Sequence, residues 1–166
     1  MTIVTRRTLL RPYDESLLSD FMLLNICAKN RAEMNGPHSV ASAKQLFSKV
    51  LHDEQLHCMA VLDNNSREYM GHVFIADLDS TPELGFIFDK TFWGQGYGSE
   101  ALCAFFPKAV RELGLSRVTA TANRHHVASI AILQKLGFEL VSEKRDIYGP
   151  YLEFEFLAEV TEHAAS

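Results

Sequence analysis

The chain has 166 residues, of which 47% are apolar and 22% charged, and its formal net charge is −5. This length suits one domain with a buried core, so we expect a single domain over residues 1–166. The acidic balance gives no basic footprint for nucleic acid, no apolar run is long enough to span a membrane, and arginines interrupt any signal-peptide pattern near the start. We therefore expect a cytoplasmic protein that binds neither nucleic acid nor membrane.

The cysteine and histidine residues indicate no metal site. Cys27, Cys58 and Cys103 are odd in number and none belongs to a C-x-x-C pair, which argues against a disulfide framework or a zinc site and suits a reducing compartment. His125 and His126 are adjacent and have no partner at ligand spacing. We expect no metal.

The first half of the chain alternates between strand and helix patterns. A β-rich stretch over residues 2–13 precedes an apolar helical pattern over residues 14–30, for which Asp14 is the expected N-cap. A turn follows, and Ser39 or Ser42 is expected to begin a second helix that continues to about Leu51. Two strand patterns then flank the turn sequence "NNSR", which predicts a hairpin; they cover residues 56–63 and 68–77.

The second half continues this alternation. Residues 82–89 read as a strand, and an apolar stripe over 101–113 predicts a helix that Gly114 closes. Pro107 lies within this stripe, so we expect a kinked but continuous helix. The remaining patterns predict a strand, a short helix closed by a glycine, and two final strands; they cover residues 117–122, 127–136, 138–146 and 151–160.

The stretch "FWGQGYGSEA" at residues 92–101 places three glycines at alternate positions between a strand and an amphipathic helix. Exposed backbone N–H groups at a helix start form an anion site. A P-loop is excluded because no lysine follows the glycines, and the dinucleotide fingerprint would require a glycine where Ser99 stands. The alternative is a turn whose glycines serve only packing.

Three stretches together resemble the GNAT N-acetyltransferases, in particular their RimJ- and RimL-like branch. "WGQGYGSEAL" resembles the acyl-CoA pyrophosphate loop, "RTLLRP" the N-terminal motif of that branch, and "SIAILQKLGF" the helix beside the pantetheine arm. The resemblance covers essentially the whole chain. It implies an α/β fold with a mixed, mostly antiparallel twisted sheet of about seven strands, flanked by about four helices and split between two parallel strands to admit acetyl-CoA.

The resemblance also implies which residues bind acetyl-CoA, the expected co-substrate. Backbone N–H groups from about Gln95 to Ser99 would hold the pyrophosphate, with Gly96 and Gly98 leaving room for its close approach. The strand over residues 84–89 would pair in part with the pantetheine arm. The expected contact residues are Phe86, Ile87, Phe88, Trp93, Gly94, Gln95, Gly96, Tyr97, Gly98, Ser99, Asn123, His126 and Ser129.

Two residues are candidates for the chemistry. Glu83 matches the position of a general-base carboxylate, and its alternative is a solvated edge residue. Ser129 matches a serine that protonates the thiolate, and its alternative is a hydrogen bond at a helix start. The chain departs from the family where His126 replaces a usual asparagine and where Leu133 replaces a tyrosine acid, which favours Ser129 or a bound water as the proton donor.

The expected reaction is direct attack of a primary amine on the thioester in a ternary complex. A protein α-amino group is a plausible acceptor because its pKa of about 7.7–8.0 leaves a useful neutral fraction at neutral pH. A small amine or antibiotic, and a non-catalytic acyl-CoA sensor, remain alternatives, and a nicotinamide-dependent oxidoreductase is a more distant one. Monomer and homodimer both remain open. Candidate acceptor-groove residues are Glu33, Asn35, His38, Tyr148 and Tyr151.

Overall fold

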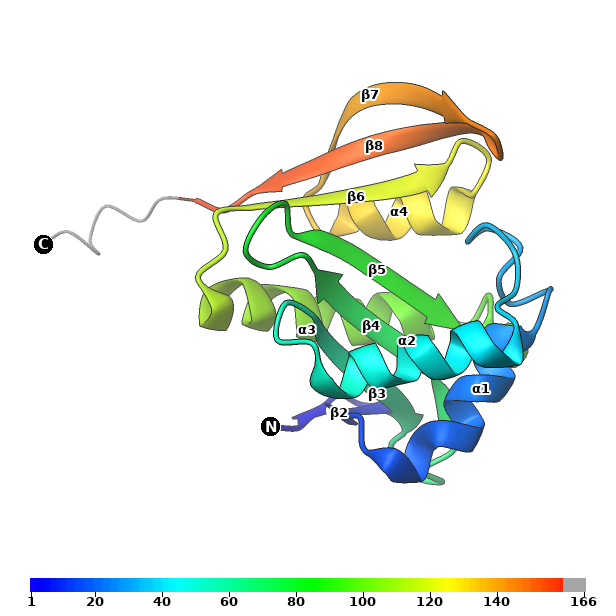
Figure 1. Ribbon diagram of the computed structural model, residues 1–166. Coiled ribbons are helices and arrows are strands. Elements are labelled where there is room, and N and C mark those ends of the chain that lie inside the picture. Colours follow the sequence, from blue (N-terminus) through cyan, green and yellow to red (C-terminus); the bar gives the residue numbers. More distant parts are fainter. Residues whose placement is uncertain (160–166) are drawn as a thin grey trace, which may run out of the picture.

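The computed structural model describes residues 1–159 and has one eight-stranded sheet with helices on both faces (Figure 1). The spatial order of the strands is β1-β2-β3-β4-β5-β6-β8-β7. Every neighbouring pair is antiparallel except β5 and β6, which are parallel. The strands are β1 (Ile3–Val4), β2 (Thr8–Pro12), β3 (His57–Asp63), β4 (Tyr69–Ala76), β5 (Glu83–Phe88), β6 (Arg117–Asn123), β7 (Glu139–Asp146) and β8 (Gly149–Leu157).

Two α-helices cover each face of the sheet. Helices α1 (Leu18–Ile26) and α2 (Val40–His52) lie in front of it in Figure 1, and α3 (Tyr97–Leu113) and α4 (Val127–Lys135) lie behind. Short 3-10 helices, η1 (Glu15–Leu17) and η2 (Lys90–Phe92), precede α1 and α3. The mixed α/β architecture expected from the sequence is confirmed.

The sheet is split between β5 and β6. These strands share a single register pair, Glu83 with Thr119, and the N–H of Thr119 donates to the carbonyl of Pro82 at 2.8 Å. Beyond this joint the two strands diverge, as Figure 1 shows. The edge of β5 that faces β6 therefore presents backbone groups to the gap over residues 84–88.

The main core lies between the sheet and α3. Phe105 and Phe106 of α3 are fully buried, and Phe106 packs against Phe138 and Phe156, with ring centroids 5.1 and 4.9 Å apart. Since Phe138 and Phe156 lie beyond the split, α3 holds the two parts of the sheet together. A smaller core of Leu17, Ala60 and Leu62 lies on the opposite face.

The predicted strand over residues 2–13 is in fact a hairpin of β1 and β2. The N–H of Thr5 donates to the carbonyl of Thr8 at 2.9 Å and turns the chain. This extra short strand brings the sheet to eight strands, where about seven were expected.

The predicted helix over residues 14–30 is wrong at both ends. The Asp14 carboxylate accepts from the N–H of Ser16 and starts a 3-10 turn, so α1 begins only at Leu18. It ends at Ile26, where the carbonyl of Asn25 accepts instead from the N–H of His38.

The later elements agree more closely with their predictions. The capping box of Ser39 and Ser42 begins α2, and Gly114, with a φ of 63°, ends α3. Helix α3 is continuous through Pro107, as expected, and Pro107 lies on its exposed side. Strand β8 begins at Gly149, earlier than predicted, and the predicted strand end at residue 160 lies outside the described residues.

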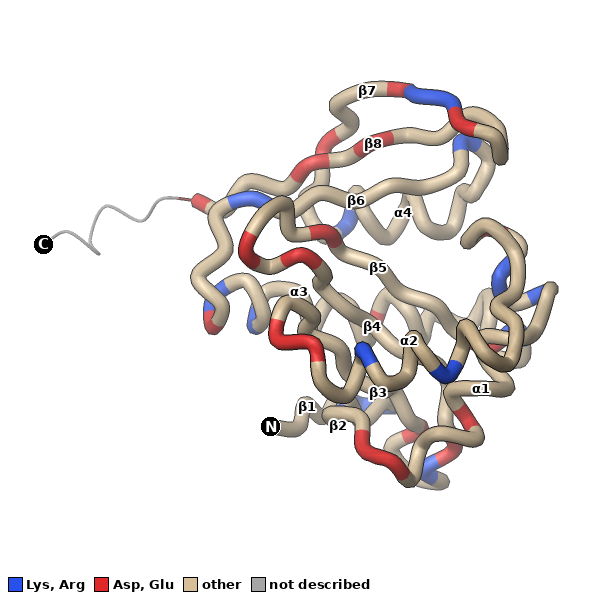
Figure 2. The backbone as a smooth tube through the Cα atoms, viewed as in Figure 1, with Lys and Arg blue, Asp and Glu red and all other residues tan. Residues whose placement is uncertain are grey.

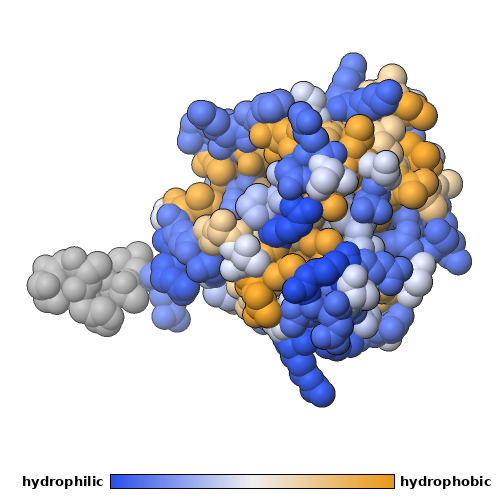
Figure 3. Space-filling model, turned by 90° about the horizontal axis from the view of Figure 1, so that it is seen from below, coloured by the Kyte–Doolittle hydropathy of each residue, from blue (hydrophilic) through white to orange (hydrophobic). Residues whose placement is uncertain are grey.

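The surface carries its charges in local groups. Figure 2 shows acidic residues at the end of α2 and around the start of β5, and basic residues on β7 beside acidic ones. Figure 3 shows, from below, several apolar patches separated by hydrophilic residues. No helix within residues 1–159 combines the length and the apolar character that crossing a membrane requires.

Candidate functional site

The turn between β5 and α3 leaves an uncapped helix N-terminus. The N-cap of this 17-residue helix is Gly96, which has no side chain to satisfy the first N–H groups. Within residues 1–159, the N–H groups of residues 94–96 also have no hydrogen-bond acceptor. This cluster of backbone donors, together with the helix dipole, suits an anionic group such as a pyrophosphate.

The glycines of this turn have different roles. Gly94 and Gly96 adopt φ angles of 73° and 82°, which side chains other than glycine rarely allow. Gly98 lies inside α3, where an added Cβ would stand 3.4 Å from Ile132 of α4 and from the Phe88 ring. A Cβ at Gly98 would make ordinary van der Waals contact there, so this position adjoins the packing of α3 against its neighbours, and the predicted role of Gly98 in leaving room for the ligand stays a prediction.

Arg7 of the N-terminal hairpin braces the turn. Its Nη1 donates to the Gln95 carbonyl at 2.9 Å, and its Nε donates to Glu100 Oε1 at 2.8 Å. Its backbone N–H donates to Glu100 Oε2 at 2.7 Å, and its guanidinium lies 4.2 Å from the Tyr97 ring centroid. These contacts direct the Gln95 carbonyl toward Arg7. Sequence reasoning missed this role of Arg7.

Lys135 brings a second cation to the turn. Its Nζ donates to Ser99 Oγ at 3.0 Å, so a residue of α4 reaches the first turn of α3. The sequence placed Ser99 among the residues that hold the pyrophosphate but assigned no role to Lys135. Lys135 lies two residues before Gly137 and gave no specific indication, because only the fold places it beside the turn.

One hydrogen bond ties the turn to the end of β5, and a second ties it to η2. The Trp93 indole Nε1 donates to the Phe88 carbonyl at 2.8 Å, and the Gln95 side chain donates to the Thr91 carbonyl at 3.0 Å. Phe88 is itself in the main core, and Phe86 packs against that core. The side chains of these two residues face α3, so a ligand lying in the split would contact their backbone groups.

Glu83 stands at the joint of the split. Leu84, Phe86 and Phe88 face α3, so by alternation Glu83 faces the side of α1 and α2. Its side chain is exposed, yet the protein around it, together with the carboxylates of Asp77 and Glu153, raises its pKa above the usual value. A raised pKa brings a carboxylate closer to what a general base requires near neutral pH.

The other predicted contact residues lie around the start of α4. Ser129 is buried in its first turn, and His126 is the residue that caps the helix. The Asn123 amide donates to Glu33 Oε2 at 2.6 Å, which joins the end of β6 to the loop between α1 and α2. Leu133, at the position of the family's tyrosine acid, is only 1% exposed and belongs to the core.

A cavity of about 220 Å³ lies between α2, the loop before it, and β4. Two residues of β5 lie opposite β4 residues that line this cavity: Glu83 is opposite Ala76, and Gly85 is opposite Phe74. The Phe74 ring covers Gly85 so closely that an added Cβ would lie 2.2 Å from it. The cavity is lined by Arg31, Met34, His38, Leu46, Lys49, Val50, Asp53, Leu56, Cys58, His72, Phe74, Ala76 and Asp77.

Buried polar groups form the floor of this cavity. Tyr13 Oη hydrogen-bonds His72 Nδ1 at 2.8 Å and also the Tyr69 hydroxyl. Burial, and then the charge of Arg31, lowers the pKa of His72 to about 3, so its imidazole is neutral. Burial raises the pKa of the Cys58 thiol and keeps it protonated.

The candidate groove residues fall in different places. His38 lines the cavity, Glu33 binds Asn123, and Asn35 is an exposed turn residue with a φ of 66°. Tyr151 pairs with Asn123 across β6 and β8, and Tyr148 is exposed at the tip of the β7–β8 hairpin.

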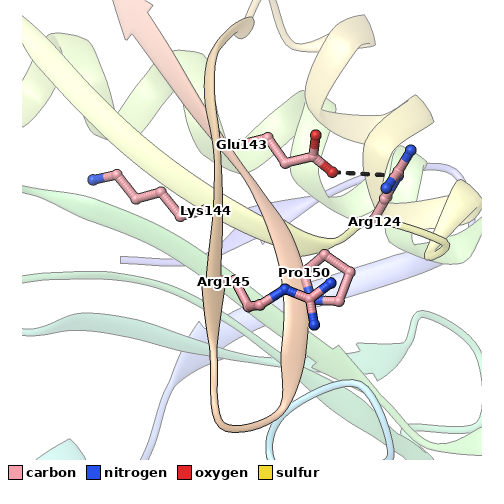
Figure 4. A pocket seen from close by; sticks show the side chains of 5 residues that line it. All are labelled: Arg124, Glu143, Lys144, Arg145 and Pro150. Atoms are coloured by element: carbon pink, nitrogen blue, oxygen red, sulfur yellow. Dashed lines mark ion pairs between the residues drawn. The ribbon is translucent and has the colours of Figure 1, made fainter.

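A second hollow, of about 300 Å³, lies on the outer hairpin (Figure 4). Arg124 Nε lies 3.3 Å from Glu143 Oε1, and Lys144 Nζ lies 3.1 Å from Glu153 Oε2. In Figure 4 the Lys144 side chain points away from Arg124. Its cations are exposed and largely paired, so we assign it no role. Elsewhere, no group of three or more His, Cys, Asp or Glu residues within residues 1–159 could hold a metal ion.

Comparisons with known proteins agree with this geometry. A family model described as an acetyltransferase (GNAT) domain matches residues 7–139. A curated Bacillus subtilis protein described as the uncharacterized N-acetyltransferase YnaD is 30% identical over 59 residues, so the match spans 36% of this chain and only 35% of that protein.

Solved structures share the fold over nearly the whole chain. A spermidine N-acetyltransferase from Vibrio cholerae, in complex with CoA and spermine, has a TM-score of 0.81 at 15% identity, covering 92% of this chain and 96% of that one. RimL, a ribosomal-protein acetyltransferase in complex with coenzyme A, has a TM-score of 0.78 at 20% identity, covering 93% and 96%.

Proposed function

This chain belongs to the GNAT acetyltransferase family, and from that premise we propose that it transfers the acetyl group of acetyl-CoA to a primary amine. The observation that carries the proposal is the split between β5 and β6, which leads directly to the open N-terminus of α3 and has Glu83 at its joint. The reaction would be direct, with both substrates bound together.

Acetyl-CoA binding is supported by the donors that the turn leaves free. The N–H groups of residues 94–99 would receive the pyrophosphate, and Lys135 and Arg7 bring positive charge to the same turn. The free edge of β5 over residues 84–88 would pair with the amide groups of the pantetheine arm. Spermidine N-acetyltransferase and RimL, which share the fold, are both seen in complex with CoA.

The proposed mechanism uses Glu83 and Ser129 on opposite faces of the sheet. Glu83 takes one proton from the acceptor ammonium and releases it to solvent. The neutral amine attacks the thioester carbon, the C–N bond forms, and the C–S bond breaks as the tetrahedral intermediate collapses. The second amine proton is lost, and the leaving thiolate gains a proton through Ser129 or a water beside it, so the products are an amide and the free CoA thiol.

The acceptor would approach from the α2 side, because Glu83 and the cavity beside it face that way. A protein N-terminal α-amino group is favoured by its pKa, which lies about 2.5 units below that of lysine. Related folds are named for ribosomal proteins and for spermidine, so a small amine is the second candidate.

The decisive experiment measures CoA thiol release from acetyl-CoA with a panel of N-terminal peptides and small amines. Release that depends on both acetyl-CoA and an amine is expected. Tight acetyl-CoA binding without release in the presence of any acceptor would instead indicate a sensor of acyl-CoA. Binding of a nicotinamide cofactor that acetyl-CoA does not displace would indicate an oxidoreductase.

A further inference from the structure

We propose that the acceptor carries an anionic group at a distance from its amine, that an apolar segment joins the two, and that Arg31 binds the anion. This inference rests on the proposed acetyltransferase function and concerns the cavity beneath α2. It assigns the two ends of that cavity to opposite charges and its middle to apolar contact.

Arg31 marks the cationic end. Its guanidinium donates to three uncharged oxygens: the Gly36 carbonyl at 2.8 Å, the Met34 carbonyl at 3.0 Å and Asn25 Oδ1 at 3.0 Å. No carboxylate within residues 1–159 lies within ion-pair distance of it. The guanidinium is half-buried, lines the cavity and has donors left over, since it presents five N–H groups.

A half-buried guanidinium with no counter-ion is an unusual arrangement. Buried charges in proteins are normally paired, because desolvation penalises a lone charge. Burial indeed lowers the pKa of Arg31, and the charge of Arg31 contributes to lowering the pKa values of His38 and His72. The rigid fork of an arginine matches a carboxylate or phosphate, so an anionic ligand group would satisfy this end of the cavity.

The opposite end is acidic in balance, with Asp53 and Asp77 lining it together with one cation, Lys49, which lies one turn before Asp53 on α2. Asp53 follows α2 and Asp77 follows β4, and both line the cavity. Glu83 lies directly beside them, since it pairs with Ala76 on β4. Acidic residues gather at the end of α2 and around the start of β5 (Figure 2), and their charge would draw an ammonium group toward the proposed base.

Apolar side chains occupy the middle of the cavity. Met34, Leu46, Val50 and Phe74 reach it from the loop, from α2 and from β4. His72 lies near enough to Arg31 for its charge to act on the imidazole, and Ala76 lies opposite Glu83. The distance between His72 and Ala76 along β4 is about 13 Å, the length of four residues of extended strand. An acceptor that spans this cavity therefore needs an extended apolar segment between its charged ends, and a short polar amine would leave the middle empty.

Arg31 also stabilises its own loop through these hydrogen bonds, and this role is compatible with ligand binding. The same three acceptors that fix the loop hold the guanidinium still, so the anion meets a donor whose position is already set. The test must therefore separate recognition of the anion from support of the loop.

The first arm of the test varies the acceptor and leaves the protein unchanged. We would measure kcat/KM for 4-aminobutanoate, 6-aminohexanoate and 8-aminooctanoate, each against the straight-chain alkylamine with the same number of carbons. We expect the carboxylate to raise kcat/KM by roughly ten- to a hundredfold at one preferred length, as one charge-assisted hydrogen bond at a partly solvated site would. The matching diamines should be the poorest acceptors, because their far ammonium would meet Arg31.

The second arm asks whether the anion belongs to a small amino acid or to a protein N-terminus. The peptide amides Ala-Leu-Glu and Ala-Leu-Gln differ only in one charge. A preference for the glutamate peptide would assign the site to N-terminal segments with an early acidic residue, and a preference confined to the amino acids would assign it to small substrates. Either preference supports the shared chemistry.

Variants complete the test. Arg31→Gln should bring the ratio of carboxylate to alkyl acceptor close to one, while Lys44→Gln, an exposed residue of α2 outside the cavity, should leave the ratio unchanged. The melting temperature and the KM for acetyl-CoA of Arg31→Gln would report on the loop, and the first arm stands even if this variant is damaged. Equal rates for carboxylate and alkyl acceptors, or a preference for diamines, would overturn the inference alone. If none of these acceptors gave thiol release from acetyl-CoA, the acetyltransferase proposal would be overturned, and this inference with it.

Discussion

Glu83 is placed where a single carboxylate affects both rate and stability. It lies at the joint of the split sheet on the side from which we propose that the acceptor approaches, and it lies near Asp77 and Glu153. We expect Glu83→Gln to lower kcat by about 10²- to 10⁴-fold, the usual contribution of general-base catalysis, with little change in acetyl-CoA affinity. Steady-state kinetics and a calorimetric titration check the two halves of this prediction, and an unchanged kcat would make Glu83 a solvated edge residue.

The same substitution should stabilise the fold at neutral pH. Because the pKa of Glu83 is raised on folding, its ionised form is less favourable in the native state than in the unfolded chain. The destabilisation is complete above the folded pKa and absent below the unfolded value of about 4.3. Melting curves should therefore show Glu83→Gln above the wild type at neutral pH, with the difference vanishing as the pH falls to about 4.

Asp77 offers a separate test through the pH profile. Its charge helps to raise the pKa of Glu83, although burial contributes more. Asp77→Asn should move the acidic limb of the kcat/KM profile toward lower pH, because the base then ionises more readily. Asp79→Asn, two residues further along the same turn and also exposed, is the matched control. An acidic limb that stays in place in both variants would contradict the assignment of Glu83 as the titrating base.

At the scale of elements, variants of Gly96 and Gly98 can separate ligand contact from helix packing in the turn before α3. Gly96→Val forces a β-branched residue into a φ of 82° at the mouth of the donor cluster, and we expect it to weaken acetyl-CoA binding by at least two orders of magnitude. Gly98→Val adds methyl groups where a Cβ alone already meets Ile132 and Phe88 at 3.4 Å. It should lower the melting temperature more than the affinity. The opposite pattern would return the ligand role to Gly98.

The brace from Arg7 ties the N-terminal hairpin to the proposed acetyl-CoA site. Arg7→Gln removes the guanidinium hydrogen bonds to Gln95 and Glu100 but keeps the backbone bond to Glu100, and it should raise the Kd for acetyl-CoA about tenfold. Arg6→Gln removes the same charge from the exposed neighbouring residue and should have little effect. Equal affinities for both variants, measured by titration, would mean that the turn keeps its shape without the brace.

Regular elements were predictable from the sequence where a pattern repeats over a whole helix or strand, as in α3 and β4. The predictions failed where one tertiary hydrogen bond decides, as at the end of α1, whose Asn25 carbonyl accepts from His38. The glycine turn was recognisable, but the roles of Arg7 and Lys135 were not, because each reaches the turn from a distant part of the chain. Arg31 carried no motif, and only the folded structure shows that it forms no ion pair within residues 1–159.

At the scale of the whole molecule, acetyl-CoA should stabilise the fold. A ligand that binds only the native state raises the free energy of unfolding by RT ln(1 + [L]/Kd), or about 2.7 kcal/mol at a hundredfold excess over Kd. We expect the melting temperature to rise with acetyl-CoA, and dephospho-CoA to retain most of the effect because it keeps the pyrophosphate and pantetheine. The absence of any shift at millimolar acetyl-CoA would contradict the co-substrate assignment.

The single joint between β5 and β6 also bears on how the two halves of the sheet would move. Since the two strands share only the register pair Glu83 with Thr119, a rotation of one strand away from the other would pivot there, against the packing of α3 on both halves. Displacement grows with distance from a pivot, so the far ends of β5 and β6, where Phe88 leads to the glycine turn and Asn123 leads to α4, would move most in such a rotation. The Glu83 carboxylate at the pivot would move least, so opening the split for a long substrate would leave the proposed base in place.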